Sequence, residues 1–449
     1  MKIIIAGAGE VGFHLAKLLS FESQDITLID INRESLNYAD THLDIKVLKG
    51  NATSVSILKE AKVESSDLVI GVTASETANI TLCLLAKQLG CKRTIARISN
   101  TEFIDNKEEI RFSHLGIDEL ISPEELAAEE IQLLLDQSAF NDSYEFEGGE
   151  LTMVGTTLMR TAPFVGKTVK EAAQIFPELH FMAIAIQRSG TQYTLIPRGD
   201  SEFKEGDQAY FVTTKDGVNE LYKLTGKTKA SIKKVMILGG SKIGFKTARD
   251  LCSNKFKVKL IEKDKNKALD LADDLPNALI INGDGRNVEL LEEEDIDEMD
   301  AFISVTGNSE TNIMSCLVAK SKNIKKTIAL VENMDYFQLS HSIGVDTLIN
   351  KKLLAANNIF RHIRKGEVVA LTRLNNLNAE ILEFIVKPSS AVTGKIIRDL
   401  DFPRSASIGG VIRDGIGQIA LGDFEIKAGD RVVVCCLPQS ISKVEKLFL

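Results

Sequence analysis

The sequence predicts an α/β protein made of two tandem units, each a Rossmann-like, doubly wound parallel sheet followed by a small α+β lobe. Three observations support this fold class. Short runs rich in Val and Ile alternate with helical stretches, a pattern typical of parallel sheets covered by helices on both faces. A Gly-x-Gly-x-x-Gly motif follows the first of these runs. The second half of the chain also repeats the first, as expected of a duplicated domain.

The repeat is visible at the level of single residues. The glycine motif that begins at Gly7 returns at Gly239, an offset of 239 − 7 = 232 residues, and Asp30 returns as Glu262 at the same offset. Matches at an offset of 233 link Asn79 to Asn312, Cys83 to Cys316 and Thr94 to Thr327. A drift of one residue over this distance indicates duplication.

The regions between the sheet modules repeat as well, so the predicted order of modules is A-B-A′-B′. Segment 198–207 corresponds to segment 421–430, each with Gly-Asp near both ends. We name the predicted modules N-lobe 1 (residues 1–137), C-lobe 1 (138–226), N-lobe 2 (232–366) and C-lobe 2 (367–449). The polar segment Gly226-Lys227-Thr228-Lys229 is the expected linker between the halves.

N-lobe 1 contains the elements of a doubly wound sheet. Helical spacing in the segment Thr77–Leu89 places Ile80, Leu84 and Leu85 on one face. The short apolar runs on either side of such segments are the expected strands, and these are Ile3–Ala6, Ile26–Asp30, Lys46–Lys49, Leu68–Val72, Thr94–Ile98 and Glu119–Ile121.

A further helix is expected from Ser122-Pro123-Glu124-Glu125 to about Asp136, since this motif supplies a cap, a first-turn proline and acidic residues that favour a helix N-terminus. This helix has more apolar side chains than one sheet edge needs, namely Leu126, Ile131, Leu133, Leu134 and Leu135. We therefore expect it to cross over and pair with another such unit; the alternative is packing within its own lobe.

The C-lobes have a different pattern, with few helical stretches. In C-lobe 1 the runs Phe181–Gln187 and Gln208–Thr213, separated by turns of glycine and acidic residues, predict a small α+β lobe of about 80 residues. In C-lobe 2 the run Val432–Cys436 predicts a strand in which Cys435 and Cys436 are buried as small apolar side chains.

The glycine motif is the main candidate for chemistry. Asp30 lies 30 − 12 = 18 residues after Gly12 and completes a dinucleotide-binding fingerprint. Gly7 allows the tight turn, Gly9 allows backbone amides to approach a phosphate, and Gly12 allows the helix to pack on the strand. Asp30 can accept hydrogen bonds from ribose hydroxyls and would repel a 2′-phosphate. The expected contacts include the intervening Ala8, Glu10 and Val11; the alternative is a relic fold whose glycines only pack.

Loops after the other strands are expected to complete this nucleotide site. Asn51 and Ala52 would lie near the adenine edge, and Thr73 and Ala74 would line the far side of the crevice. Arg97 ends the fifth strand and points to the same edge, where a phosphate contact and a structural ion pair are equally plausible.

The corresponding site of N-lobe 2 is altered. Ser241 replaces the middle glycine, which puts a side chain where the backbone should meet a pyrophosphate. Leu330 stands in place of Arg97, while Glu262 is retained. A second site is therefore expected to be weaker, altered or absent.

Composition and the absence of certain motifs disfavour several classes of function. The chain has 449 residues, 44% of them hydrophobic, and a net charge of −9 disfavours a dedicated nucleic-acid binder. Six cysteines without a C-x-x-C pair indicate a reduced, cytosolic protein without a zinc knuckle. No targeting segment is visible, and no apolar run approaches the roughly 20 residues that span a bilayer. No catalytic or metal-ligating set accompanies the nucleotide signal, so we expect no enzyme and no metal site.

The motifs together resemble the RCK (regulator of potassium conductance) domain family. The residues that carry the resemblance are the glycine motif Gly7–Gly12, Asp30, Gly50-Asn51-Ala52-Thr53, Thr73, Asn79, Arg97 and Leu120-Ile121-Ser122-Pro123. Two such units in one chain, without a membrane helix, resemble the tandem RCK regulatory subunits of Trk-type potassium uptake systems. The resemblance covers essentially the whole chain.

The resemblance implies a regulatory protein at the cytoplasmic face of the cell membrane. It implies NAD(H) or ATP and ADP as regulatory ligands, a homotetramer that forms a gating ring, and a TrkH-like membrane channel subunit as partner. A different reading of the glycine motif is an NAD-dependent oxidoreductase with a duplicated Rossmann fold, and a third is a scaffold that no longer binds nucleotide.

Overall fold

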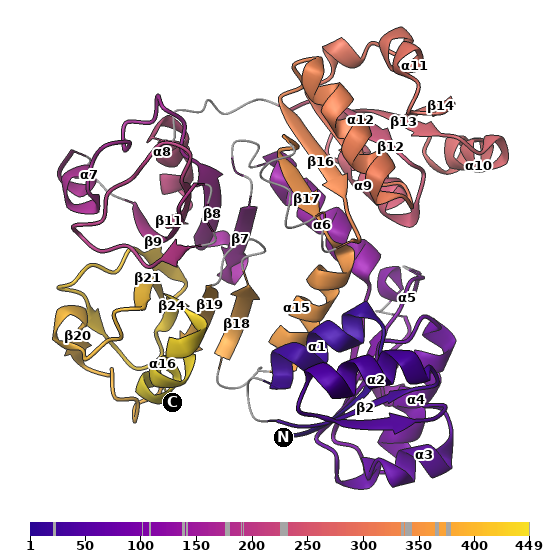
Figure 1. Ribbon diagram of the computed structural model, residues 1–449, viewed down its shortest axis with the longest axis horizontal. Helices are drawn as coiled ribbons and strands as arrows, with labels where there is room; N and C mark the ends of the chain where they lie inside the picture. The colour runs from indigo at the N-terminus through magenta and orange to yellow at the C-terminus, as the bar shows by residue number, and fades with distance from the viewer. Residues whose placement is uncertain are drawn as a thin grey trace. The chain divides into compact units, whose positions relative to one another are not determined.

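The computed structural model (Figure 1) describes most of the chain. The described residues are 1–20, 24–100, 102–106, 109–136, 140, 142–175, 180–189, 191, 193–224, 232–333, 336, 344–363, 368–373 and 379–448. The expected linker 226–229 lies outside them. No helix within these ranges has both the length and the apolar character needed to cross a bilayer.

The first half begins with a six-stranded parallel sheet in the order β3-β2-β1-β4-β5-β6. Its strands are β1 (Lys2–Ala6), β2 (Asp25–Asp30), β3 (Lys46–Lys49), β4 (Leu68–Gly71), β5 (Arg93–Arg97) and β6 (Glu119–Ile121). The helices are α1 (Glu10–Ser20), α2 (Arg33–His42), α3 (Val55–Glu60), α4 (Glu76–Gln88), α5 (Glu102–Asp105) and α6 (Pro123–Asp136). All six expected strands are present within one residue of their predicted bounds, and the order is that of a Rossmann sheet.

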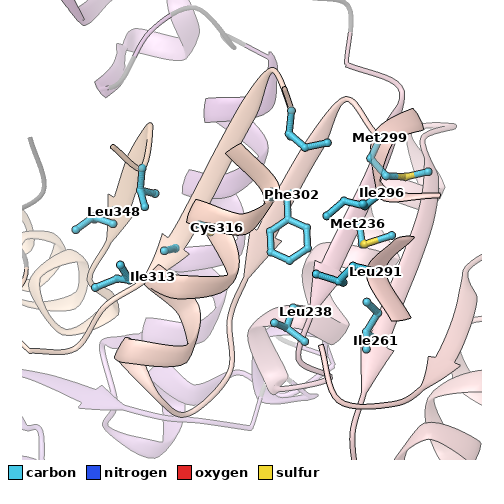
Figure 2. Packing of buried hydrophobic residues seen from close by; sticks show 14 of the residues in the cluster. Met236, Leu238, Ile261, Leu291, Ile296, Met299, Phe302, Ile313, Cys316 and Leu348 are labelled. Atoms are coloured by element: carbon cyan, nitrogen blue, oxygen red, sulfur yellow. The ribbon is translucent and has the colours of Figure 1, made fainter. Parts of the chain in front are cut away.

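The second half contains a sheet with the same topology, β14-β13-β12-β15-β16-β17. Its strands are β12 (Lys234–Leu238), β13 (Lys257–Glu262), β14 (Leu279–Asn282), β15 (Ala301–Ser304), β16 (Lys326–Leu330) and β17 (Thr347–Ile349). Its helices are α9 (Lys242–Ser253), α10 (Lys265–Asp274), α11 (Val288–Glu293), α12 (Ser309–Ser321) and α15 (Lys351–Ile363). Figure 2 shows its core, in which Met236 and Phe302 of central strands are fully buried beside Cys316 of α12.

The two C-lobes are small α+β lobes, as predicted, and each contains an antiparallel sheet. C-lobe 1 is a sheet in the order β10-β9-β11-β8-β7, and C-lobe 2 a sheet in the order β18-β19-β24-β21-β22. The strands are β7 (Asp142–Phe146), β8 (Leu151–Thr157), β9 (Phe181–Gln187), β10 (Thr194–Leu195), β11 (Gln208–Thr214), β18 (Val368–Arg373), β19 (Glu380–Ile385), β21 (Ala406–Arg413), β22 (Ile416–Gln418) and β24 (Arg431–Cys436). A small β20 (Lys395–Ile396) and β23 (Glu425–Ile426) pair separately, and the helices are α7 (Val169–Ile175), α8 (Gly217–Leu224) and α16 (Ile441–Phe448).

The C-lobes share one hydrophobic core. Met153 and Ile184 of C-lobe 1 belong to the same buried cluster as Ile381, Val433 and Cys435 of C-lobe 2. Cys435 and Cys436 are fully buried, as expected, and burial raises the pKa of the Cys435 thiol to about 12.

Helix α15, although it belongs to the second half of the sequence, packs with the first sheet domain. Contacts divide the chain into two compact units, and one of them consists of residues 1–130 together with 349–363. In this unit α15 packs against α1 and β6, so a helix from the second half completes the first sheet domain. Residues 131–136 of α6 belong to the other unit, and the pairing of this helix with another such unit stays a prediction.

The buried face of α4 differs from the expected one. Ile80, Leu84 and Leu85 are only half-buried, whereas Asn79, Leu82, Cys83 and Ala86 are buried. Asn79 can face the sheet because its side chain is fully hydrogen-bonded to backbone groups there, which removes the cost of burying an amide.

Candidate functional site

The predicted nucleotide residues of the first half lie at the carboxyl ends of strands β1 to β5, as last residues of strands, in the loops that follow, or in the first turn of α1. In a sheet of this order the strand connections diverge between β1 and β4, and ligands of such sheets bind at that point. The turn from β1 to α1 and the loop after β4 flank it from either side. The fold therefore brings the motif, Asp30, Thr73 and Arg97 to one edge, as the sequence predicts.

Two of the three motif glycines are required by the fold itself. Gly7 has φ +110°, and a Cβ there would lie 2.9 Å from the backbone of Val72 and Thr73. A Cβ on Gly12 would lie 1.8 Å from the carbonyl oxygen of Gly7. Gly9 is different, because no atom lies within 4 Å of the position its Cβ would take and its φ is not positive. The turn therefore leaves open space at the one glycine that the fold does not need.

Asp30 fixes this turn from the end of β2. Its Oδ2 accepts a hydrogen bond from the backbone N–H of Ala8 (2.5 Å), and its Oδ1 accepts one from that of Asn32 (2.8 Å). Each carboxylate oxygen retains capacity for a further donor, such as a hydroxyl. Asp30 thus orients the loop and is available at the edge that a ribose would approach.

Asn51 and Ala52 hold the loop after β3 in shape. Asn51 Oδ1 accepts hydrogen bonds from the N–H and the hydroxyl of Thr53, at 3.0 and 2.9 Å. Ala52 is half-buried against the core of the first sheet. Asn51 therefore stabilises the loop and Ala52 packs against the core. The expected contact of these two residues with an adenine ring stays a prediction.

Asn79 organises the far side of the crevice, a role that the sequence did not reveal. Its Oδ1 accepts from the N–H and hydroxyl of Thr73 (2.9 and 2.7 Å), and its Nδ2 donates to the carbonyls of Thr73 and Arg97 (3.1 and 2.9 Å). Asn79 thereby ties the end of β4 to the end of β5. Asn312 makes the same contacts to Thr306 and Leu330, so its recurrence at the repeat offset was the available signal.

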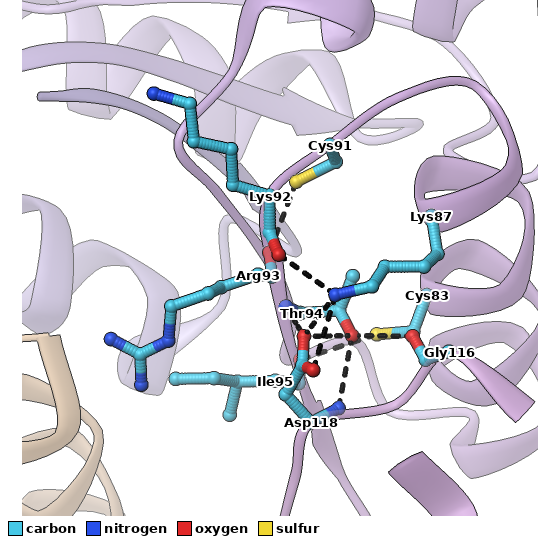
Figure 3. A network of polar contacts seen from close by, with 9 residues as sticks. All are labelled: Cys83, Lys87, Cys91, Lys92, Arg93, Thr94, Ile95, Gly116 and Asp118. Atoms are coloured by element: carbon cyan, nitrogen blue, oxygen red, sulfur yellow. Dashed lines mark hydrogen bonds and ion pairs between the residues drawn. The ribbon is translucent and has the colours of Figure 1, made fainter. Parts of the chain in front are cut away.

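Strand β5, which ends at Arg97, is anchored by the polar network of Figure 3. Lys87 Nζ pairs with Asp118 (2.8 Å), and Asp118 Oδ2 accepts from the N–H of Thr94 (2.8 Å). The Thr94 hydroxyl donates to the carbonyl of Gly116 (2.6 Å). At the other end of the strand, the half-buried Arg97 guanidinium forms no ion pair or hydrogen bond with the described residues. The alternative of a structural ion pair therefore finds no partner within those ranges.

The corresponding turn of N-lobe 2 is filled by its own side chain. Ser241 Oγ donates to the carbonyl of Val305 (2.8 Å) and accepts from the N–H of Gly244 (3.2 Å), so it caps α9. Burial disfavours the charged form of Glu262, but hydrogen bonds from Asp264 and Gly240 and an ion pair with Lys267 (3.2 Å) hold the pKa of its carboxyl below the usual range. The Ser241 hydroxyl and the Glu262 carboxylate, which would contact a nucleotide here, therefore already have hydrogen-bond or ion-pair partners.

One residue near the first site was not among the sequence predictions. Lys352 Nζ, on α15, lies 2.9 Å from Oε2 of Glu10, the residue after Gly9. These two residues are 352 − 10 = 342 positions apart. No spacing rule within one copy of the repeat connects them, so only the structure brings them together.

Comparison with known proteins gives consistent matches along the chain. The TrkA-N domain family matches residues 3–123 and 235–351, and the TrkA-C domain family matches residues 153–226 and 381–449. Among curated proteins, the Trk system potassium uptake protein TrkA homolog 2 of Methanosarcina mazei is 32% identical over 100% of both chains. The TrkA protein of Haemophilus influenzae is 31% identical over 100% of this chain and 98% of its own length.

Solved structures share the fold at lower identity. The GsuK RCK domain superposes with a TM-score of 0.60 at 17% identity and covers 100% of this chain and 94% of its own. A GsuK channel bound to NAD gives the same TM-score and identity, over 100% of this chain and 78% of its own. A GsuK structure bound to ADP gives a TM-score of 0.51 at 13% identity, over 82% and 70% of the two chains.

Proposed function

The chain belongs to the TrkA family of Trk system potassium uptake proteins, a family of regulatory subunits rather than enzymes, and from this premise we propose that it senses nucleotides for a Trk-type potassium uptake system. The proposed ligands are NAD(H), ATP and ADP. The proposed partner is a TrkH-like membrane channel subunit, on which a homotetramer of this chain acts as a gating ring at the cytoplasmic face of the membrane.

The observation that carries the ligand assignment is the open space at Gly9. Gly7 and Gly12 are explained by backbone geometry, but Gly9 is not, so a ligand that approaches the backbone there accounts for it. The amides at the start of α1 and the helix dipole favour an anion at this point. Arg97, whose guanidinium has no partner among the described residues, adds a positive charge at the same sheet edge, which suits phosphates. GsuK, which shares the fold, has been solved with NAD and with ADP.

The first site is proposed as the main sensor. In N-lobe 2 the Ser241 side chain occupies the turn and Lys267 neutralises Glu262, so a nucleotide there would have to displace existing contacts. The ring can respond only to the difference in nucleotide affinity between two of its conformations. Such coupling is typically about 1–3 kcal/mol per linked site, and several sites in one ring can add.

The test is potassium flux in vesicles that contain the membrane subunit, measured with and without this protein in the presence of ATP, ADP or NADH. Flux that depends on both protein and nucleotide is expected, together with nucleotide binding without turnover. Equal flux under all of these conditions would contradict the proposal. Steady consumption of NADH with a small substrate would instead favour an oxidoreductase.

A further inference from the structure

Helix α15 brings a positive charge to the glycine turn of the first half. Asn350 caps this helix, since its Oδ1 accepts from the N–H groups of Lys352 (2.9 Å) and Leu353 (3.1 Å). This fixes the first turn of α15 where the helix packs on α1. Lys352 Nζ then reaches Oε2 of Glu10 at 2.9 Å, at the start of α1.

The two lysines at the start of α15 have separate partners. Lys351 pairs with Oε1 of Glu124 (3.4 Å), whose side chain is 9% exposed. Lys352 is directed instead to Glu10, whose side chain is 60% exposed. The first pair ties the beginning of α15 to the beginning of α6. The second involves the residue that directly follows Gly9, the glycine whose Cβ position is open.

Glu10 alone is unsuited to a phosphate site. A carboxylate on the first residue of α1 stabilises the helix through its dipole, but it repels an anion that approaches the same amides. Lys352 offsets that repulsion, because its ammonium group lies against the Glu10 carboxylate and is a strong hydrogen-bond donor. A terminal phosphate that replaces Glu10 as partner would gain a charge-assisted hydrogen bond.

We propose that Lys352, from the second half of the chain, is a ligand-binding residue of the first-half nucleotide site and that it favours nucleotides with a terminal phosphate, such as ATP, over dinucleotides such as NADH. Glu10 holds this lysine in place before the ligand arrives. This inference rests on the proposed nucleotide site. It adds that a residue of α15, which belongs to the same compact unit as the first sheet, takes part in the site.

The experiment compares the Kd values of ATP, ADP and NADH for the full-length protein by calorimetry at low and moderate salt. Lys352→Gln is expected to weaken ATP binding about tenfold, in line with the loss of one charge-assisted hydrogen bond, and NADH binding less than threefold, or about 0.6 kcal/mol. Lys352→Arg should retain most of the ATP affinity. Lys351→Gln is the matched control and should leave all three Kd values unchanged, and thermal unfolding identifies any variant that is not folded.

A double variant distinguishes a direct contact between Lys352 and the phosphate from a role in which Lys352 only neutralises the charge of Glu10. If Lys352 contacts the phosphate, Glu10→Gln with Lys352→Gln should bind ATP more weakly than Glu10→Gln alone. If the double variant binds ATP as tightly as Glu10→Gln alone, Lys352 only screens Glu10 and the inference is wrong. Wild-type affinity in Lys352→Gln, with affinity still lost in Gly9→Ser, would overturn this inference and leave the nucleotide site standing. Absence of binding in the wild-type protein would overturn both.

Discussion

Ile184 and Gly409 occupy the same position in the two C-lobes and meet each other. Each is the residue at which the strand register shifts, in β9 and β21 respectively, and each lies four positions before an arginine, 188 − 184 = 4 and 413 − 409 = 4. A Cβ added to Gly409 would lie 2.9 Å from Cγ2 of Ile184 and 2.8 Å from Cγ2 of Val212. The absent side chain in one lobe therefore makes room for the large one in its duplicate.

This size match predicts a coupled effect on stability. Gly409→Ala should cost about 1–3 kcal/mol of unfolding free energy through overpacking, and Ile184→Ala about 2–5 kcal/mol through a cavity. The double variant should cost less than the sum, with a coupling of about 0.5–3 kcal/mol in chemical denaturation. Gly307→Ala is the control, since a Cβ there has open space. Strict additivity would show that the two residues do not compete for the same volume.

The three motif glycines are predicted to respond differently to substitution. Gly9→Ser should leave the melting temperature near the wild-type value but weaken nucleotide binding, because the new side chain enters space that only a ligand needs. Gly12→Ala should lower the melting temperature, because its Cβ would collide with a backbone carbonyl. Differential scanning fluorimetry and calorimetry measure the two effects. If Gly9→Ser binds nucleotide with unchanged affinity, the assignment of the ligand to this turn is wrong.

Asp30 is predicted to discriminate against NADP. Its carboxylate lies at the edge that a ribose would approach, so a 2′-phosphate there should cost about 1–3 kcal/mol, or roughly tenfold to a hundredfold in affinity. Asp30→Asn should narrow the ratio of NADP and NAD Kd values, while Glu262→Gln in the second half should not change it. Equal affinity of the wild-type protein for both cofactors would exclude this role.

Two duplicated carboxylates predict a loss of stability in acid. Asp300 accepts from the N–H groups of Lys233 and Lys234 and pairs with Lys325, and Asp67 accepts from Lys2 N–H and pairs with Lys92. Burial opposes ionisation of Asp300, but these donors hold the pKa of its carboxyl below the usual range; hydrogen bonds from Lys92 and Lys2 lower the pKa of Asp67.

A carboxyl with a lowered folded-state pKa stabilises the protein above its unfolded pKa near 3.9, and this contribution disappears as the pH falls through the folded-state value. Asp300→Asn should therefore lower the melting temperature at pH 7 and have a smaller effect at pH 3. Asp423→Asn, whose carboxyl lies on an exposed turn of C-lobe 2, is the comparison variant. An effect of Asp300→Asn that is equal at both pH values would contradict the assignment.

Local features of the fold were predictable because each depends on residues close in sequence. The strands of the first sheet follow from apolar runs, and the turn after β1 follows from Gly7 and Gly12. The placement of Asn79 was not predictable from helix periodicity, since a polar residue on a helix is expected to face solvent and only its backbone partners show otherwise. The pairing of Glu10 with Lys352 depends on a helix exchanged over more than 300 positions, which no local pattern encodes.

The helix exchange also has a consequence for synthesis on the ribosome. The first compact unit needs residues 349–363, so it stays unfinished until about four fifths of the 449 residues have been translated. The nascent first sheet must therefore leave the surface that later receives α15 exposed during elongation. An mRNA truncated after the first half would produce a chain in which this surface stays exposed to solvent. Such a chain could aggregate or bind the equivalent helix of another molecule.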